Sequence, residues 1–363
     1  MAELSDRMRA LVQPHLAGIE PYDPSFTPCR INLSANENTY PLPASVRASV
    51  DAALAATPLN RYPDPLSGEL RCELAARHGL APENVCVGNG GDELLFNFLL
   101  AFGGEGRRVL NCPPCFSEYE FFASLTRTGV RNVRRDRRTF ELDERALLAA
   151  APHTNLAILT SPNNPTGNPV SASFVAQLCR ACPGPVMVDE AYIEFADEGV
   201  SVERLLGSCS NLVILRTLSK AFGAAGIRCG YALAAPDVIE VFAAIRQIYS
   251  VNVLTQAAAL ALVRARAELA PAVAQVRAER ARLLAALEAD ERLEVWPSQG
   301  NFLLVRMDEA SRIRERLRDE RSILVRDFSY ASGLEGCLRI TVGTPEENDE
   351  LLAALTALLD EEG

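Results

Sequence analysis

Lys220 carries the side chain in this sequence best suited to nucleophilic chemistry. It is the only lysine among 36 basic residues, and the other 35 are arginines. A guanidinium stays protonated, whereas a desolvated ammonium can lose its proton and attack a carbonyl carbon. Lys220 closely follows the apolar run 212–215, which predicts a buried strand, and α/β sheets bind ligands just beyond such strands. We therefore expect a catalytic lysine, although a stray lysine in an arginine-rich sequence is the alternative that residue type alone leaves open.

Asp189, Tyr192 and Asn164 also follow predicted strands and could contact a cofactor ring. Asp189 ends the apolar run 186–189, where a carboxylate could keep a pyridine nitrogen protonated and so make the ring an electron sink. Tyr192 could reach an oxygen of the same ring. Asn164, within the turn-forming segment 161–167, could direct its amide N–H at that oxygen. Two of these residues have ordinary alternatives, since Asp189 could cap a helix and asparagine before proline, as at Asn164, often forms a turn.

Three further features are suited to binding anions. Residues 88–91 are rich in glycine and lead from a predicted strand into a helix, so the backbone there could bind an anion; a plain tight turn is the alternative. Arg228 could supply the bidentate grip that a phosphate needs, or form a surface ion pair. Arg339 lies in the apolar strand 338–342, where a buried cation favours a carboxylate ligand.

These residues belong to a repeating order of strand, loop and helix that predicts an α/β fold. The strands are predicted at 85–87, 108–111, 156–160, 185–189, 212–216 and 230–234. The helices are predicted at 44–56, 67–77 and 92–102 and between most of the later strands. This alternation favours a large domain with a mostly parallel sheet covered by helices.

The pattern changes after residue 252 and predicts a smaller α/β domain. Residues 253–289 have the spacing of long helices, with a break or bend near Pro271. Short strands are predicted at 293–296, 302–305, 323–325 and 338–342, and a last helix at 345–359. The proline-rich residues 1–43 are expected to form an arm that packs with this small domain. The predicted division is therefore an arm at 1–43, a large domain at 44–252 and a small domain at 253–363.

The composition argues against several classes of partner. The net charge of −11 and the isoelectric point of about 5.0 disfavour nucleic acid and anionic membranes. Five arginines within 131–138 are expected to form a solvated turn or hairpin face. No apolar run reaches membrane-spanning length and the N-terminus lacks a secretory signal, so we expect a cytoplasmic protein. The ten cysteines are then reduced thiols, and the two Cys-x-x-Cys pairs lack nearby histidines, so no metal site is expected.

Taken together, these motifs resemble those of the fold-type I, pyridoxal-phosphate-dependent aminotransferases, and most closely those of the histidinol-phosphate aminotransferase family. The similarity extends over nearly the whole chain. Its additional signatures are residues 33–38, 60–64, 297–302 and 341–348. The resemblance implies pyridoxal 5'-phosphate as the cofactor and amino transfer between histidinol phosphate and 2-oxoglutarate, a step of histidine biosynthesis.

The resemblance implies a role in cofactor binding for each matching residue. Lys220 would hold the cofactor covalently and later move a proton, and Asp189 would pair with the pyridine nitrogen. Asn164 and Tyr192 would contact the ring oxygen. Phe116 would stack on the ring, at a position where the family usually has tyrosine. The phosphate would be bound by the backbone of Gly91 and Asp92, the hydroxyls of Thr217 and Ser219, and Arg228.

The resemblance also implies contacts with the substrate and with a second subunit. Tyr62 would reach the phosphate of the neighbouring subunit, which implies a homodimer. Arg339 would bind the substrate carboxylate or the phosphate-bearing end of histidinol phosphate. Tyr22 and Arg326 match family positions that line the substrate site.

The substrate is less firmly implied than the cofactor, because Thr39 and residues 23–26 depart from the family pattern near the substrate. An aromatic amino-acid aminotransferase or a phosphoamino-acid decarboxylase of the same fold would share the cofactor residues. A transcription regulator with an aminotransferase-like domain would need a DNA-binding module, for which the roughly 30 residues before the family-like region are too few. A nicotinamide oxidoreductase would need a different glycine spacing.

Overall fold

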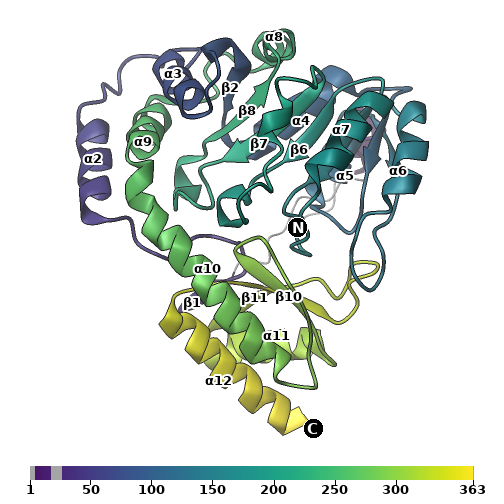
Figure 1. Cartoon of the computed structure of the whole chain (residues 1–363), viewed down its shortest axis with the longest axis vertical. Coiled ribbons are helices and arrows are strands. Elements are labelled where there is room, and N and C mark those ends of the chain that lie inside the picture. Colours follow the sequence, from purple (N-terminus) through teal and green to yellow (C-terminus); the bar gives the residue numbers. More distant parts are fainter. Residues whose placement is uncertain (1–4, 18–26, 363) are drawn as a thin grey trace.

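The computed structural model describes residues 5–17 and 27–362, which form a larger and a smaller α/β unit with one sheet each (Figure 1). The larger unit contains a seven-stranded sheet in the order β2-β8-β7-β6-β5-β3-β4. Its strands are β2 (Val85–Gly88), β3 (Arg108–Asn111), β4 (Gly129–Asn132), β5 (Leu156–Thr160), β6 (Val186–Asp189), β7 (Leu212–Thr217) and β8 (Gly230–Ala234). Only β8 runs antiparallel to its neighbours, so the prediction of a mostly parallel sheet is confirmed.

Helices cover both faces of the large sheet. They are α2 (Ala44–Ala55), α3 (Gly68–Arg77), α4 (Gly90–Phe102), α5 (Glu118–Leu125), α6 (Glu144–Ala150), α7 (Ala172–Ala181), α8 (Pro236–Ile245) and α9 (Val253–Arg264). Successive strand residues face opposite sides: Met187 clusters with α4, α5 and α8, whereas Val188 clusters with α2, α3, α6, α7 and α9. Because β5, β6 and β7 are buried along their whole length, a ligand can reach them only at their ends.

The smaller unit has a five-stranded sheet in the order β1-β11-β12-β10-β9. Its strands are β1 (Ile31–Leu33), β9 (Glu294–Trp296), β10 (Phe302–Arg306), β11 (Ile323–Asp327) and β12 (Cys337–Thr341), and its helices include α11 (Ala310–Arg321) and α12 (Pro345–Glu362). β1 comes from the N-terminal segment and pairs in parallel with β11, while the other pairs are antiparallel. The N-terminal segment therefore contributes an edge strand to the small sheet.

The helical region 253–289 differs from its prediction at Pro271. The break lies at Ala265, between α9 and α10 (Arg266–Glu288), and Pro271 is inside α10. Proline removes one N–H donor, which would bond Ala267, and the remaining long run of alanine, leucine, arginine and glutamate keeps the helix intact. Figure 1 shows α10 extending from α9 toward the small sheet. The division at residue 252 stays a prediction, because α9 packs against α2 and α3.

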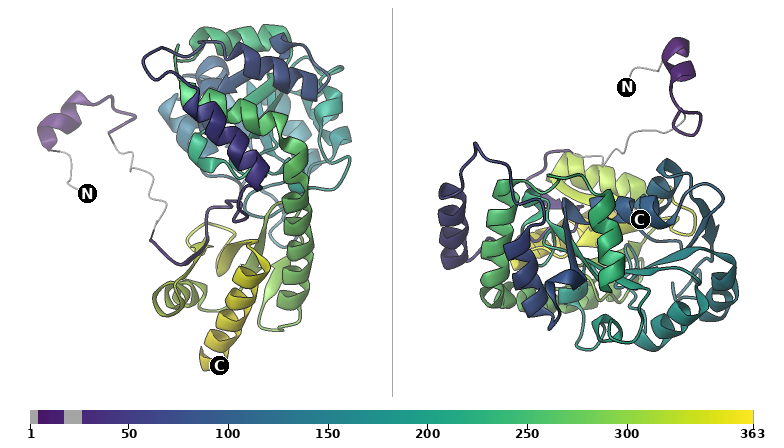
Figure 2. Two further views of the ribbon diagram at one scale, coloured as in Figure 1. Left: turned by 90° about the vertical axis from the view of Figure 1, so that its left-hand side faces the viewer. Right: turned by 90° about the horizontal axis from the view of Figure 1, so that it is seen from above.

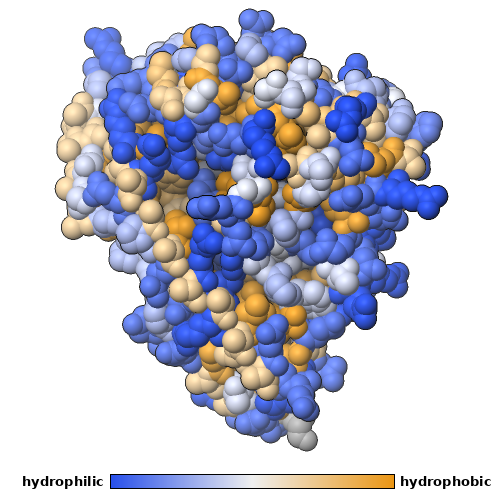
Figure 3. All heavy atoms as spheres, in the orientation of Figure 1, coloured by the Kyte–Doolittle hydropathy of each residue, from blue (hydrophilic) through white to orange (hydrophobic). Residues whose placement is uncertain are grey.

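The surface combines features that the sequence only partly indicated. Figure 2 shows the short helix α1 (Asp6–Leu11) standing away from both units, and Figure 3 shows mostly hydrophilic side chains on one face, with apolar areas between them.

The predicted solvated arginine face is wrong for Arg135, which is buried and donates to the carbonyls of Cys112 and Phe140. All ten cysteines are free. Within the described ranges, no helix is long and apolar enough to span a membrane.

Candidate active site

A cleft of about 540 Å³ lies between the two units, at the carboxyl ends of β5, β6 and β7. The start of α4 forms one side, and β11 and β12 contribute another. The predicted site residues that line it are Gly91, Asp92, Phe116, Asn164, Asp189, Tyr192, Thr217, Ser219, Lys220, Arg228, Arg326 and Arg339. The structure thus brings together side chains that are spread over some 250 residues of sequence.

Lys220 follows β7 and lies deep in the cleft. Its Nζ donates a 2.9 Å hydrogen bond to the carbonyl of Ala35 and lies 5.8 Å from the centre of the Tyr192 ring. Burial, together with the positive charge of Arg339, lowers the pKa of Lys220 to about 8. A substantial fraction of this amine is therefore neutral, and nucleophilic, near physiological pH.

Asp189 ends β6 as a buried carboxylate with two donors. The hydroxyl of Tyr119 donates to Oδ2 over 2.7 Å, and the backbone N–H of Ala191 donates to Oδ1 over 3.0 Å. Burial raises the pKa of Asp189 to about 6, while the Tyr119 and Ala191 bonds oppose that rise. A buried anion of this kind is suited to pairing with a cationic ring nitrogen, which would replace the water that the carboxylate has lost.

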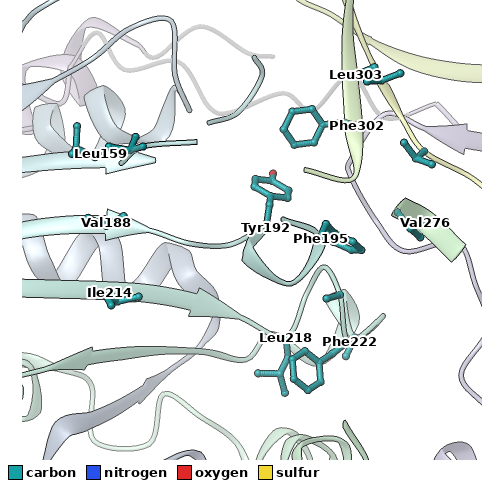
Figure 4. Packing of buried hydrophobic residues seen from close by; sticks show 14 of the residues in the cluster. Leu159, Val188, Tyr192, Phe195, Ile214, Leu218, Phe222, Val276, Phe302 and Leu303 are labelled. Atoms are coloured by element: carbon teal, nitrogen blue, oxygen red, sulfur yellow. The ribbon is translucent and has the colours of Figure 1, made fainter. Parts of the chain in front are cut away.

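Tyr192 lies between the end of the large sheet and the small sheet. Its ring meets that of Phe302 edge to face, with 5.0 Å between the centroids, and Figure 4 shows the two rings pointing toward each other. The hydroxyl accepts a 3.0 Å hydrogen bond from Nδ2 of Asn36. Burial raises the pKa of Tyr192, so the hydroxyl stays protonated and can donate.

Asn164 and Arg339 contact each other across the cleft. Nη1 of Arg339 donates to Oδ1 of Asn164 over 2.6 Å, and Nη2 donates to the carbonyl of Ser34. Because the Asn164 carbonyl oxygen is thus engaged, its Nδ2 group is the end that can donate to a ligand. Arg326 stands opposite Arg339 in the β11–β12 ladder, so two arginines lie side by side at the cleft wall.

A cluster of groups suited to binding an anion, called the cradle below, lies at the start of α4. Arg228 donates to Oδ2 of Asp92 over 2.9 Å and to the hydroxyl of Ser219 over 3.3 Å. Thr217 donates to the same Ser219 hydroxyl over 2.9 Å. The cradle needs glycine: a Cβ on Gly90, whose φ is +81°, would lie 2.5 Å from Nη2 of Arg228. Free N–H groups at a helix start, two hydroxyls and an arginine in one place fit the phosphate of pyridoxal phosphate.

Phe116 lines the cleft between this cradle and Asp189. Its ring packs edge to face on Tyr119, with 5.6 Å between the centroids. This contact fixes the plane of the ring, and the ring offers a stacking surface without a polar group.

Two predicted residues are not brought into the cleft. Tyr22 lies outside the described residues. Tyr62 is 79% exposed and stacks on Tyr249, with 4.5 Å between the ring centroids, and it does not line the cleft of its own chain.

Several groups that form hydrogen bonds with the predicted site residues were not identified from the sequence. Tyr119 and Asn36 bond Asp189 and Tyr192, and the carbonyls of Ser34 and Ala35 bond Arg339 and Lys220. The only available signal was proximity: Tyr119 follows Phe116 by three residues, and the other three lie in the family-like segment 33–38.

Comparisons with known proteins agree with this arrangement. The sequence profile of the family "Aminotransferase class I and II" matches residues 30–355. A histidinol-phosphate aminotransferase of Thermoanaerobacter pseudethanolicus is 36% identical over 350 residues, covering 96% of this chain and 99% of the relative. The histidinol-phosphate aminotransferase of Sinorhizobium meliloti, solved in complex with pyridoxal-5'-phosphate, superposes with a TM-score of 0.88 at 27% identity, covering 97% and 98% of the two chains.

A decarboxylase shares the fold as well. The L-threonine-O-3-phosphate decarboxylase of Porphyromonas gingivalis has a TM-score of 0.79 at 26% identity, covering 91% of this chain and 99% of its own. The fold and the cleft, with a buried lysine beside a cluster of groups suited to binding an anion, are those of an enzyme. The chain belongs to the aminotransferase class I and II family and is an aminotransferase.

Proposed function

We propose that the protein is a pyridoxal-phosphate-dependent histidinol-phosphate aminotransferase with 2-oxoglutarate as the partner substrate. The proposal rests on a second potential anion-binding site in the cleft. Beyond the cradle around Arg228, the cleft wall holds Arg326 and Arg339 in register on neighbouring strands. An enzyme that binds both a phosphorylated amine and a dicarboxylate needs such a pair, since arginine binds either anion with two N–H groups.

An aromatic wall beside the arginines supports an imidazole-containing substrate. Phe328 and Tyr330 line the cleft after β11, and their rings stack with 6.4 Å between the centroids. The Arg339 guanidinium lies 5.4 Å from the centre of the Phe328 ring. A flat imidazole ring can pack on such a wall while the arginines bind its phosphate. The name shared by the relatives at 34–40% identity agrees with this choice.

The chemistry follows from the positions of the side chains. When bound, pyridoxal phosphate supplies a carbonyl carbon that accepts the amino group and a ring that withdraws electrons. Nζ of Lys220 would remove a proton from the substrate carbon that bears nitrogen and deliver it to the carbon on the other side of that nitrogen, a task suited to its pKa of about 8. Asp189 keeps the ring nitrogen protonated, and Asn164 and Tyr192 donate to the ring oxygen. Phe116 covers one face of the ring and excludes water.

A homodimer and a cytoplasmic location are further parts of the proposal. Tyr62, Leu59 and Ile248 are 79%, 74% and 67% exposed, and Tyr62 stacks on Tyr249 next to Ile248. Exposed apolar side chains gathered in this way favour contact with another subunit. A second copy could then bring Tyr62 to the cradle.

Two alternatives share the cofactor residues. The similarity to a phosphothreonine decarboxylase favours a phosphoamino-acid decarboxylase as the second candidate. An aromatic amino-acid aminotransferase would use the same aromatic wall without the phosphate.

A donor panel with product analysis tests these choices. Purified enzyme is given imidazole-acetol phosphate with glutamate, aspartate, phenylalanine or tyrosine, and separately L-threonine O-3-phosphate, and 2-oxo acids and carbon dioxide are quantified. We expect glutamate and imidazole-acetol phosphate to give histidinol phosphate and 2-oxoglutarate in equal amounts, without carbon dioxide. Carbon dioxide release without a keto product would instead identify a decarboxylase. A clear preference for an unphosphorylated aromatic amino acid would remove the histidinol-phosphate assignment and leave the aminotransferase assignment standing.

A further inference from the structure

Asn36 is a fully buried polar residue whose side chain links the small sheet to Tyr192. Its backbone N–H donates to Oγ1 of Thr341 over 3.0 Å, and that hydroxyl donates to Oδ1 of Asn36 over 3.1 Å. Nδ2 of Asn36 donates to the hydroxyl of Tyr192 over 3.0 Å. Nδ2 of Asn301 donates to the carbonyl of Asn36 over 3.1 Å. The side chain and both backbone polar groups of Asn36 are therefore held by bonds within the protein.

The backbone at this position restricts the residue type. Asn36 has a φ of +55°, in the left-handed region that asparagine, aspartate and glycine tolerate best. Its neighbours contact other site residues: the Ala35 carbonyl accepts from Lys220, and the Ser34 carbonyl accepts from Arg339. Residues 34, 35 and 36 thus contact the cleft arginine, the catalytic lysine and Tyr192, in that order.

We propose that Asn36 is a positioning residue that sets the direction of the Tyr192 hydroxyl proton. A tyrosine hydroxyl has one proton to donate and accepts through its oxygen. Because the oxygen accepts from Asn36, its own proton is directed elsewhere, and the cleft beside Lys220 is where the ring oxygen of pyridoxal phosphate would bind. The inference rests on the proposed placement of Tyr192 at that oxygen and not on the choice of substrate.

The charged groups around Tyr192 allow its hydroxyl proton to point into the cleft beside Lys220. Arg339 is a cation near the ring and cannot accept a hydrogen bond from the hydroxyl, and Nζ of Lys220 would be joined to the cofactor in the holoenzyme. Asp189 and Asp92 raise the pKa of Tyr192 from a greater distance, but Asp189 already accepts from Tyr119 and Asp92 from Arg228. Asn36 is the group that bonds the hydroxyl directly.

The test is the pH at which the visible absorption of the cofactor bound to the holoenzyme changes. Asn36→Asp keeps the side-chain size and the allowed backbone, but a carboxylate can only accept, so Tyr192 would donate to it and not to the ring oxygen. When the ring oxygen loses a hydrogen-bond donor, the cofactor holds more tightly the proton whose release changes its visible absorption. We expect the transition to move to higher pH by about one unit, in the same direction as in Tyr192→Phe.

Two further measurements distinguish the effect of the altered Asn36–Tyr192 hydrogen bond from the effect of the added carboxylate charge. Asn38→Asp adds a carboxylate two residues away, where Asn38 Nδ2 donates to the Ala221 carbonyl over 3.3 Å, and should give a clearly smaller shift. In the Tyr192→Phe background, Asn36→Asp should add little further shift. Equal shifts with and without the Tyr192 hydroxyl would overturn the inference, as would an unshifted transition in Asn36→Asp.

Asn36→Gly replaces Asn36→Asp if that variant does not fold, and Tyr192→Phe tests the placement of Tyr192 itself. If Asn36→Asp does not fold, Asn36→Gly allows the same backbone and removes the donor: a shift to higher pH supports the inference, and no shift overturns it. An unchanged transition in Tyr192→Phe would overturn the placement of Tyr192 and the inference with it. Neither result depends on the donor panel, so a wrong substrate assignment is distinguished from a wrong role for Asn36.

Discussion

The hydroxyl of Tyr119 lies 2.7 Å from Oδ2 of Asp189 and joins two elements that are 70 residues apart in sequence. The same hydroxyl lies 2.7 Å from Oγ1 of Thr160. This donor stabilises the ionised form of Asp189 and opposes the rise in pKa that burial causes. The ionisation of Asp189, which we propose pairs with the cofactor ring nitrogen, is therefore favoured by a tyrosine that does not line the cleft.

Removing that hydroxyl should weaken cofactor binding in a pH-dependent way. In Tyr119→Phe the pKa of Asp189 rises above about 6, so less of the carboxylate is ionised near neutrality. A hydrogen bond to a charged group is worth about 1.5–3 kcal/mol, which corresponds to at least about tenfold in affinity. Titration of the apoenzyme with pyridoxal phosphate should show this loss at pH 6–7 and a smaller one at pH 8.5. Tyr231→Phe is the matched control, since that buried hydroxyl contacts His78 and should leave the pH dependence unchanged. Equal losses in the two variants would contradict the prediction.

Covalent attachment of the cofactor should follow the titration of Lys220. Its pKa of about 8 means that the neutral fraction is about a tenth at pH 7 and most of the amine at pH 9. We expect the rate of attachment to the apoenzyme to rise about tenfold over this interval and then level off. Borohydride reduction followed by mass spectrometry should place the cofactor on the peptide containing Lys220. Lys220→Arg keeps the charge and should show no attachment; a rate that keeps rising above pH 10 would exclude the lowered pKa.

Asp189→Asn should lower activity and stabilise the apoprotein. The pKa of Asp189 is raised from 3.8 to about 6, so the stability that this group contributes is present below pH 4 and is lost as the pH rises through 6. An amide avoids that loss, and the Tyr119 hydroxyl can turn to accept from it. Urea unfolding of the apoprotein should show a gain of about 2 kcal/mol at pH 7 and little difference at pH 4. Turnover of the holoenzyme should fall by about 100-fold or more, and near-normal turnover would remove Asp189 from the mechanism.

The two cleft arginines should differ in their effect on the two half-reactions. Loss of a buried charged contact costs about 2–5 kcal/mol, so Arg339→Ala should lower kcat/KM by about 30-fold or more for both substrates. Arg326→Ala should mainly affect the phosphorylated substrate. Arg306→Ala is a control on the same sheet, because Arg306 lies over Trp296 and pairs with Glu294 outside the cleft. Normal single-turnover kinetics of Arg326→Ala with histidinol phosphate would contradict this assignment.

Gly230→Ala should displace the start of α4, which forms part of the cradle. Its Cβ would lie 2.6 Å from the carbonyl carbon of Gly90 and 2.7 Å from the backbone nitrogen of Gly91, so the start of α4 would have to move away from β8. We expect a loss of about 1–3 kcal/mol in unfolding free energy and weaker cofactor binding. At Gly226 a Cβ would meet no atom within 4 Å, and Gly226→Ala should change stability by less than about 0.5 kcal/mol. Similar losses in both variants would show that close packing is not the cause.

The sequence predicted the parts of the site that follow buried strands. β5, β6 and β7 are short apolar runs, and parallel strands share one carboxyl edge, so Asn164, Asp189 and Lys220 were expected to meet there. The exposed edge strand β4 was not predicted, because its residues have no apolar alternation. Pro271 was expected to break a helix, but the helix tolerates it near its start.

Partners of the predicted residues could not be deduced in the same way. Tyr119 and Asn36 reach Asp189 and Tyr192 across 70 and 156 residues, and no periodicity links such positions. Their contacts depend on how α5 and the segment after β1 pack, which is a property of the tertiary structure. The pKa of Lys220 is likewise lowered in part by Arg339 of β12, which lies 119 residues away in sequence.

The pairing of β1 with β11 has a consequence during synthesis of the chain. Residues 31–33 leave the ribosome early, but their partners at 323–325 are made roughly 290 residues later. At about 5–20 residues per second, the early strand waits roughly 15–60 s for its partner. Over that time the large sheet can form, while the carbonyls of Ser34 and Ala35 have no fixed position relative to Arg339 and Lys220. Until almost the last strand has been translated, Lys220 of the nascent chain therefore lies in a pocket that lacks the wall formed by the small sheet.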